Sequence, residues 1–148
     1  MNNINERMAK VMGWQLLKEG EEFPFFVREY DDQIAPSDVY ITDTEIKYWV
    51  GGWHPDTSIE QAMMVARKII ETEHKFYTIV KLSLYPNGID VTIEKYKLRA
   101  SDSDYPVHKW LAVGEIGEEA KAICEAILET MDENNIIPLN LDMEDKDE

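Results

Sequence analysis

The chain of 148 residues is poor in the side chains from which most catalytic and metal sites are built. It contains a single cysteine, Cys124, which cannot form an internal disulfide bond and lies in an apolar helical pattern, so we interpret it as a buried thiol. Its three histidines, His54, His74 and His108, are never three or four residues apart, so they form no helical pair of metal ligands. We therefore expect neither a metal ion nor another cofactor.

Long apolar runs and positive charge are also scarce. No segment approaches the ~18 consecutive apolar residues that a membrane-spanning helix needs, and the first six residues lack the basic and apolar regions of a signal peptide. We therefore expect a cytoplasmic protein without a membrane partner. Lysine and arginine number 15 against 30 aspartates and glutamates, a net charge of −15 that argues against nucleic acid as a partner.

Sequence motifs of established catalytic chemistry are missing as well. The chain has no P-loop, no G-x-G-x-x-G pattern and no nucleophile elbow. Ser101, Asp102, Ser103, Asp104 and His108 lie close together, but in a polar stretch without an oxyanion-hole pattern, so a solvated loop is the preferred interpretation. Because carboxylates are abundant, no acid–base pair stands out. We predict that the protein is not an enzyme.

The clearest pattern that is present lies between Trp53 and Glu73. Thr57 and Glu60 fit a T-x-x-E capping box, which predicts that a helix starts at this point. Apolar residues then recur at intervals of three and four, as on one face of an amphipathic helix. The predicted buried face consists of Ile59, Met63, Ala66, Ile69 and Ile70.

Patterns before this helix predict further elements. A first helix over residues 4–12 ends at Gly13, a residue type typical of a helix C-terminus, and a short extended piece starts at Trp14. Aromatic residues over 23–27, with Pro24 among them, favour an edge strand. Residues 39–50 look like a loop with extended portions.

Patterns after the helix predict a β-hairpin, one more strand and a last helix. Apolar and polar residues alternate over 76–85 and 89–94, and Pro86-Asn87-Gly88 between them suits a hairpin with a bulge. A short strand is expected over 110–113. The last helix opens at Gly117, and its predicted buried face is Ile116, Ala120, Ile123, Cys124, Ile127, Leu128 and Met131.

Together these elements predict an α+β fold in which an antiparallel β-sheet is sandwiched by helices, an α-β-α arrangement. Residues 1–136 are expected to form a single domain, followed by a disordered acidic tail at 137–148. Seven acidic residues and one lysine lie between Asp132 and Glu148. The tail is interpreted either as a solubilising segment or as an acidic arm that mimics DNA or binds a partner.

Two segments carry groups that recognise a nucleotide-like anion. In the first, Trp49, Trp53 and His54 precede the predicted helix start at Thr57 and Ser58, where backbone N–H groups and the helix dipole favour an anion. The indole rings could stack on a base. The alternative interpretation is that the tryptophans belong to the core.

The second segment is a basic strand end that contains Lys95, Tyr96, Lys97 and Arg99. We expect Lys97 and Arg99 to contact the ligand, with Arg99 on a phosphate or diphosphate group. The alternative is that these basic residues form the solvent-exposed face of a strand.

Three different short blocks, each present once, together span most of residues 5–130. They are Val11-Met12-Gly13-Trp14, Trp53-x-Pro55-x-Thr57-Ser58-Ile59 and Glu119-Ala120-x-Ala122-Ile123-Cys124-x-Ala126-Ile127-Leu128. As a set they resemble the phage ABA sandwich domain family, small α-β-α proteins of phages and prophages. In general build the chain is also similar to phage anti-Thoeris proteins, which sequester an immune signal of the cyclic ADP-ribose type. The resemblance implies a fold and a phage setting.

From these points we expect a phage-encoded anti-defence protein that acts in the cytoplasm of the host cell. It would sequester a small nucleotide immune signal, of the cyclic nucleotide or cyclic ADP-ribose type, without turnover. A homo-oligomer, with the pocket between protomers, is the expected assembly. The alternative is an acidic protein–protein inhibitor or DNA mimic that acts on a host defence protein.

Overall fold

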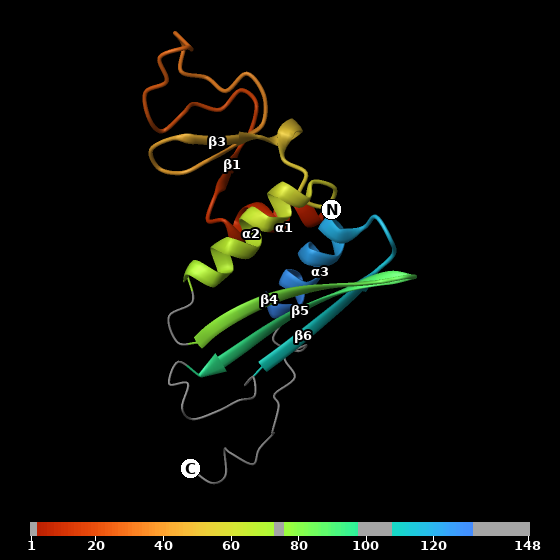
Figure 1. Ribbon diagram of the computed structural model, residues 1–148. Coiled ribbons are helices and arrows are strands. Elements are labelled where there is room, and N and C mark those ends of the chain that lie inside the picture. The colour runs from red at the N-terminus through yellow and green to blue at the C-terminus, as the bar shows by residue number, and fades with distance from the viewer. Residues whose placement is uncertain (1–2, 73–75, 98–107, 132–148) are drawn as a thin grey trace. The chain divides into compact units, whose positions relative to one another are not determined.

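The computed structural model describes residues 3–72, 76–97 and 108–131. These ranges contain three α-helices and two three-stranded antiparallel sheets, which confirms the predicted α+β class. Within the span that the sequence predicts as one domain, the contacts cluster into two compact units, and the boundary between them along the chain falls between His54 and Pro55. Figure 1 shows the elements of each unit. The predicted tail at 137–148 lies outside the described residues.

The first unit opens with helix α1 (Ile4–Val11), as predicted. The Asn3 side chain accepts a hydrogen bond of 2.7 Å from the Glu6 N–H, and so satisfies one of the free donors of the first turn. Gly13 has a φ of 86°, a left-handed conformation that glycine adopts without steric cost, and the helix ends there.

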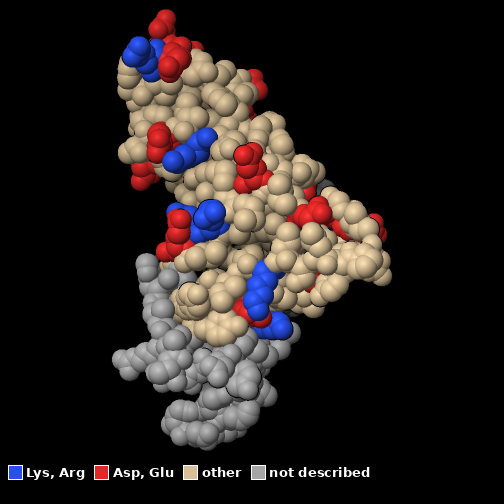
Figure 2. Space-filling model, in the orientation of Figure 1, with Lys and Arg blue, Asp and Glu red and all other residues tan. Residues whose placement is uncertain are grey.

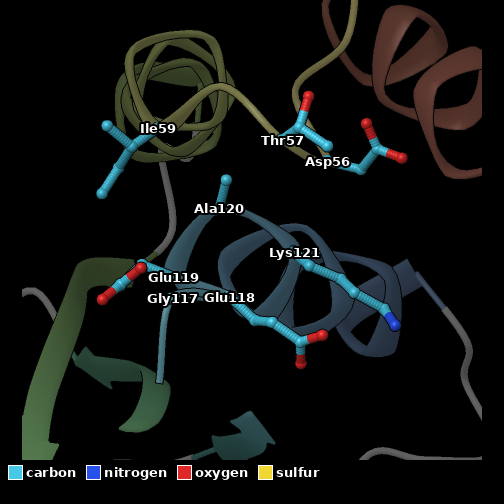
Figure 3. A pocket seen from close by; sticks show the side chains of 8 residues that line it. All are labelled: Asp56, Thr57, Ile59, Gly117, Glu118, Glu119, Ala120 and Lys121. Carbon is cyan, nitrogen blue, oxygen red and sulfur yellow. The ribbon is translucent and has the colours of Figure 1, made fainter. Parts of the chain in front are cut away.

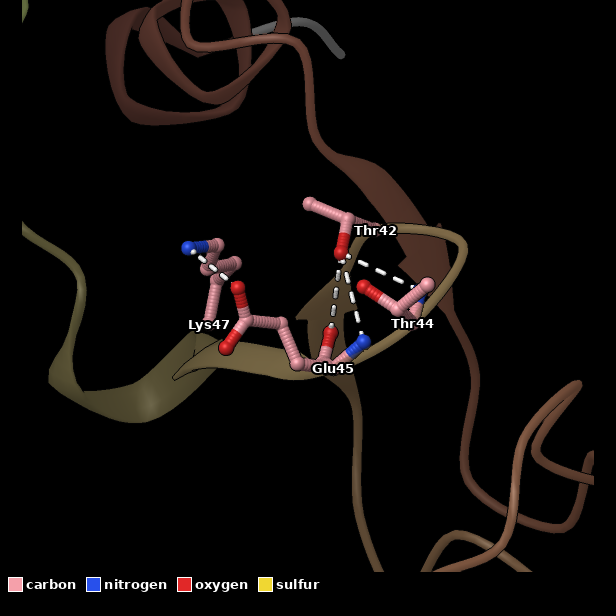
Figure 4. Close-up of polar contacts among 4 residues, drawn as sticks. All are labelled: Thr42, Thr44, Glu45 and Lys47. Carbon is pink, nitrogen blue, oxygen red and sulfur yellow. Dashed lines mark hydrogen bonds and ion pairs between the residues drawn. The ribbon is translucent and has the colours of Figure 1, made fainter.

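The sheet of the first unit contains β1 (Gln15–Leu17), β2 (Val39–Ile41) and β3 (Ile46–Trp49), in that order, and is followed by the 3-10 turn η1 (Val50–Gly52). The interpretation of residues 39–50 as a loop with extended portions was correct for the extended portions, which are β2 and β3, but it did not predict that they pair with each other. The Thr42 hydroxyl accepts hydrogen bonds of 3.3 Å from the Thr44 and Glu45 N–H groups and closes the turn (Figure 4). Strands of three and four residues are too short for their alternation to be recognised.

The prediction of a strand over residues 23–27 was wrong. This part of the chain contributes one isolated bridge, between Glu22 and Ile34, and no strand. Pro24 has no N–H to donate to a ladder, and the Val27 N–H donates instead to the Gln33 side chain at 2.7 Å. Phe23 and Val27 are nevertheless buried, in a cluster with residues Ala35, Val39 and Ile41.

The second unit contains α2 (Ile59–Thr72), β4 (Phe76–Tyr85), β5 (Gly88–Lys97), β6 (His108–Gly114) and α3 (Glu119–Met131). Its sheet has the order β4-β5-β6, and the predicted hairpin and last strand are confirmed. The register runs without interruption from Phe76 opposite Lys97 to Tyr85 opposite Gly88, so the hairpin has a two-residue turn and not the expected bulge.

Helix α3 packs on β5 and β6, while α2 packs on α3 and β4 (Figure 1). Ile89, Val91 and Ile93 of β5 are buried on the face that the helices cover, the inner face, as their alternation predicts. On the opposite, outer face, Leu111 and Val113 are exposed. Among the described residues, no helix is long and apolar enough to cross a bilayer.

Helix α2 differs from the prediction in its start and in its orientation. Its first turn is capped by Ser58, whose hydroxyl accepts a hydrogen bond of 3.2 Å from the Gln61 N–H, one residue later than the expected cap at Thr57. Its buried residues are Ala62, Val65 and Ala66, so only one of these belongs to the predicted face. Ile59, Met63 and Ile70 are exposed instead.

Helix α3 buries most of its predicted face. Its buried residues are Ala120, Ala122, Ile123, Cys124, Ala126 and Ile127. Met131 at its end and Ile116, which precedes the helix, are exposed. The interpretation of Cys124 as a buried thiol is confirmed.

Candidate functional site

The two predicted binding segments are placed very differently, and Trp53 occupies a core position. Its side chain is 3% exposed, and its indole N–H donates to the Asn5 carbonyl at 2.9 Å. Its ring centroid lies 4.8 Å from that of Trp14 and 4.9 Å from that of Tyr48. Trp53 is therefore a core residue, because its ring packs against Trp14 and Tyr48 and its indole N–H is hydrogen-bonded.

Trp49 is half-buried and packs against the core cluster that contains Phe23 and Val39. Its ring meets that of Tyr30 edge to face, with 6.5 Å between the centroids. His54, the last residue of the first unit, is exposed. These contacts place Trp49 among the packing residues of the first unit.

Thr57 belongs to the second unit and lines a hollow of about 470 Å³ (Figure 3). The hollow lies between the segment that precedes α2 and the start of α3. Asp56, Glu118 and Glu119 contribute carboxylates to its lining and Lys121 contributes one ammonium group, so the net charge of the lining opposes the expected anion. The hydroxyl of Ser58 is meanwhile engaged as the helix cap.

Of the basic strand end, Lys97 is the last residue of β5, and Arg99 lies outside the described residues. Lys95 is described fully, and it lies on the inner face of the sheet, in phase with Val91 and Ile93. A charged residue thus occupies a position where the alternation of the strand calls for an apolar one. The surroundings of Lys95 make this end of the sheet the candidate site.

Three polar residues form a row across the inner face. The register places Thr78 of β4 opposite Lys95 of β5, and Lys95 opposite His108 of β6. Trp110 follows two residues after His108 and therefore lies on the same face. We call these four residues the inner-face cluster.

Three atoms of the inner-face cluster are buried without a partner. Thr78 Oγ1, His108 Nδ1 and Trp110 Nε1 have no hydrogen bond within the described part of the chain. A buried polar group without a partner costs about 1–3 kcal/mol, so three on one face of one sheet are an unusual concentration. The inner-face cluster therefore has the polar groups of a binding site.

Aromatic rings position the charged member of the cluster. The Lys95 ammonium group lies 5.9 Å from the centroid of the Phe76 ring and 5.8 Å from that of Trp110, both within cation–π range. The His108 ring lies 5.8 Å from the Phe76 ring. Burial lowers the pKa of His108 and the nearby Lys95 charge lowers it further, so the imidazole is neutral near pH 7.

Sequence reasoning did not recognise Thr78, His108 or Trp110 as site residues. A signal was available, because Thr78 falls in the apolar phase of β4, between Phe76 and Val80. Polar residues at the inner-face positions of adjacent strands, all at the same end of the sheet, are the pattern that indicates the site.

Other classes of site find little support among the described residues. No group of three His, Cys, Asp or Glu side chains within 3–72, 76–97 and 108–131 is arranged to hold a metal ion. The Cys124 thiol contacts the Pro55 carbonyl at 3.3 Å, and burial raises its pKa to about 12. A thiol with this pKa is protonated near pH 7 and is a poor nucleophile.

Comparisons of the chain with models of protein families, with curated proteins and with solved structures find no match. The resemblance to the phage ABA sandwich family, and the phage setting that it implies, therefore stay predictions.

Proposed function

We propose that the protein is a cytoplasmic binding protein that sequesters a small nucleotide-like anion at the inner-face cluster, without turnover. The observation that carries the proposal is the row of Thr78, Lys95 and His108 beside Trp110, in which three buried polar atoms lack partners. A ligand with several acceptor oxygens would satisfy these atoms.

The size of the row favours a nucleotide over a simple ion. Adjacent strands lie about 4.8 Å apart, so the backbones of Thr78 and His108, two strands apart, are separated by roughly 10 Å. A single phosphate group is narrower than this row of three strands, whereas the phosphate and ribose of a nucleotide extend over its width. The indole N–H and the ammonium group can only donate, so the ligand must bring acceptors.

Within the described part of the chain, the lack of hydrogen bonds to Thr78 Oγ1 and His108 Nδ1 of the inner-face cluster supports binding over catalysis. A nucleophile and its general base must lie within hydrogen-bond reach of each other, about 2.6–3.2 Å. Neither the Thr78 hydroxyl nor His108 Nδ1 has a hydrogen-bond partner within the described residues, so the two do not form such a pair, and the Cys124 thiol is protonated. The role that the resemblance suggests, capture of a host immune signal during phage infection, belongs to the same proposal.

The indole N–H of Trp110 offers a direct test by ¹H–¹⁵N NMR. We expect cyclic AMP or ADP-ribose to shift the Trp110 indole resonance and to leave that of Trp53, which already donates to the Asn5 carbonyl, in place. Inorganic phosphate serves as the small-ion probe and is expected to bind far more weakly. If none of the three probes moves the Trp110 resonance, the cluster does not bind this class of ligand.

Substitution of Lys95 tests whether its positive charge contributes to nucleotide binding. Lys95→Met keeps the length of the side chain over the two rings and removes the ammonium group, and we expect it to weaken nucleotide binding at least about tenfold, as loss of a charged hydrogen bond does. Lys47→Met is the matched control, because the Lys47 ammonium pairs with Glu45 on the first unit. Equal affinity of both variants would remove Lys95 from the site.

Mass spectrometry of the bound nucleotide, released by heating after long incubation, tests for turnover. An intact ligand is expected from a sequestering protein. A hydrolysed ligand would identify an enzyme.

A further inference from the structure

The most exposed large apolar side chain of the described residues belongs to Phe26, which is 80% exposed. It lies in the first unit, between the buried residues Phe23 and Val27, and its neighbour Phe25 packs against the Phe23 ring with 5.7 Å between the centroids. The chain thus buries Phe23 and Val27, partly buries Phe25 and presents the Phe26 ring to solvent. We call residues 23–33 the Phe26 loop.

The Phe26 loop is held in one conformation by the side chain of Gln33. The Gln33 amide accepts from the Val27 N–H at 2.7 Å, donates to the Val27 carbonyl at 2.7 Å and also donates to the Tyr30 carbonyl. Gln33 itself has a φ of 58°, a left-handed conformation that is uncommon for a residue other than glycine.

Backbone hydrogen bonds close the loop at its base. The Phe23 N–H donates to the Gln33 carbonyl at 2.9 Å, and the Ala35 N–H donates to the Glu21 carbonyl at 2.8 Å. An ordered segment loses little conformational entropy when it binds, so an exposed aromatic ring on such a loop is well suited to act as an anchor.

The charge around the loop indicates the chemistry of the partner. Between Lys18 and Asp32 there are six acidic and two basic residues, all with exposed side chains. Figure 2 shows charged side chains, with carboxylates in the majority, over the part of the first unit that this segment forms. An acidic segment that carries an apolar anchor is complementary to a protein surface with lysine and arginine around an apolar pocket.

We infer that the Phe26 loop is a docking element that inserts Phe26 into an apolar pocket of a partner protein with a basic rim. The interaction is independent of the inner-face cluster, which lies in the other unit. Because the segment that carries the anchor is acidic, association should be faster at low salt and weaken as salt is added.

The test uses the full chain, immobilised, to capture proteins from a bacterial lysate, with Phe26→Ala and Leu84→Ala as paired variants. Leu84 is 68% exposed on β4 and is the matched control for loss of an exposed apolar side chain. Support requires a captured protein that Leu84→Ala retains and Phe26→Ala loses. The purified partner must then bind the wild-type chain more weakly in high salt, and at least about tenfold more weakly when Phe26 is truncated.

A Gln33→Ala variant tests whether binding needs the ordered conformation of the Phe26 loop or only the exposed ring of Phe26. It keeps Phe26 but removes the hydrogen bonds to Val27, so the inference predicts weaker binding of the same partner. Phe26→Ala should leave the urea unfolding midpoint unchanged. Absence of any captured protein that depends on Phe26, salt-independent binding of that protein, or a large loss of stability in Phe26→Ala would overturn the inference.

Discussion

The Glu94 carboxylate is buried on the outer face of the second sheet, and its charge is compensated there. It accepts a hydrogen bond of 2.8 Å from the Tyr96 hydroxyl, and its oxygens lie 3.1 Å from the Lys81 ammonium and 3.9 Å from that of Lys109. Burial alone would raise the pKa of Glu94, but the hydrogen bond and the two lysines outweigh burial and bring the pKa below its ordinary value of 4.5. The ionised form of Glu94 therefore stabilises the fold.

We expect Glu94→Gln to lower the free energy of unfolding by about 1–3 kcal/mol at pH 7, because it removes a buried charge that accepts a hydrogen bond from Tyr96. The pKa is lower in the folded chain than in the unfolded chain, so this contribution is complete above pH 4.5 and is lost as the pH falls through the lowered folded value. Urea unfolding of both proteins between pH 7 and pH 3 should therefore show a difference that shrinks towards pH 3.

Asp90→Asn is the control for this measurement, since Asp90 lies on the same face of β5 as Glu94 but not between the two lysines. Its effect should be small at every pH. A Glu94→Gln effect that stays constant from pH 7 to pH 3 would show that ionisation of Glu94 is not what stabilises the fold.

At the scale of elements, the turn between β4 and β5 depends on the absence of a side chain at Gly88. A Cβ atom at this position would lie 2.9 Å from the Gly114 carbonyl oxygen, closer than a carbon and an oxygen can approach without backbone movement. We expect Gly88→Ala to destabilise the protein by about 1–3 kcal/mol, as overpacking does. The measurement is the urea midpoint, with Gly51→Ala as control.

A Cβ atom at Gly51 meets nothing within 4 Å, so this variant isolates the general effect of adding a methyl group to a glycine. Two variants of equal stability would indicate that the ends of β5 and β6 can separate at little cost.

The elements that the sequence predicts well are those with long, regular patterns. The hairpin of β4 and β5 was predictable because apolar and polar residues alternate over 76–85 and 89–94, on the two sides of a strong turn signal. The hairpin of β2 and β3 was missed because each strand is short and a threonine hydroxyl, not a glycine, shapes the turn. The face of α2 was misplaced because small residues, Ala62 and Ala66, are buried in preference to Met63 and Ile70.

The candidate site was predictable only in part, for a related reason. A tryptophan in a sequence does not reveal whether its ring is in the core, and the partner that satisfies Trp53, Asn5, lies 48 residues earlier in the chain. Lys95 could be recognised as an exception to the alternation of its strand, but its neighbours across the sheet depend on the register with Thr78 and His108.

At the scale of the whole molecule, acidic charge dominates. The chain carries 30 carboxylate side chains and 15 lysines and arginines, and an exposed ion pair such as that of Lys47 and Glu45 contributes little to stability. Repulsion among the excess carboxylates is therefore expected to outweigh these attractions in the folded chain, and it is relieved when the chain expands on unfolding.

Sodium chloride should accordingly stabilise the protein. The Debye length falls from about 30 Å at 0.01 M to about 10 Å at 0.1 M, so most of the repulsion between carboxylates is screened over this range. We expect the thermal unfolding midpoint at pH 7 to rise between these two concentrations, measured by circular dichroism. The rise should be smaller at pH 5.5, nearer the isoelectric point of about 4.5, where fewer charges repel. A midpoint that falls with salt at pH 7 would mean that attractive ion pairs, and not the net charge of −15, control the stability of this chain.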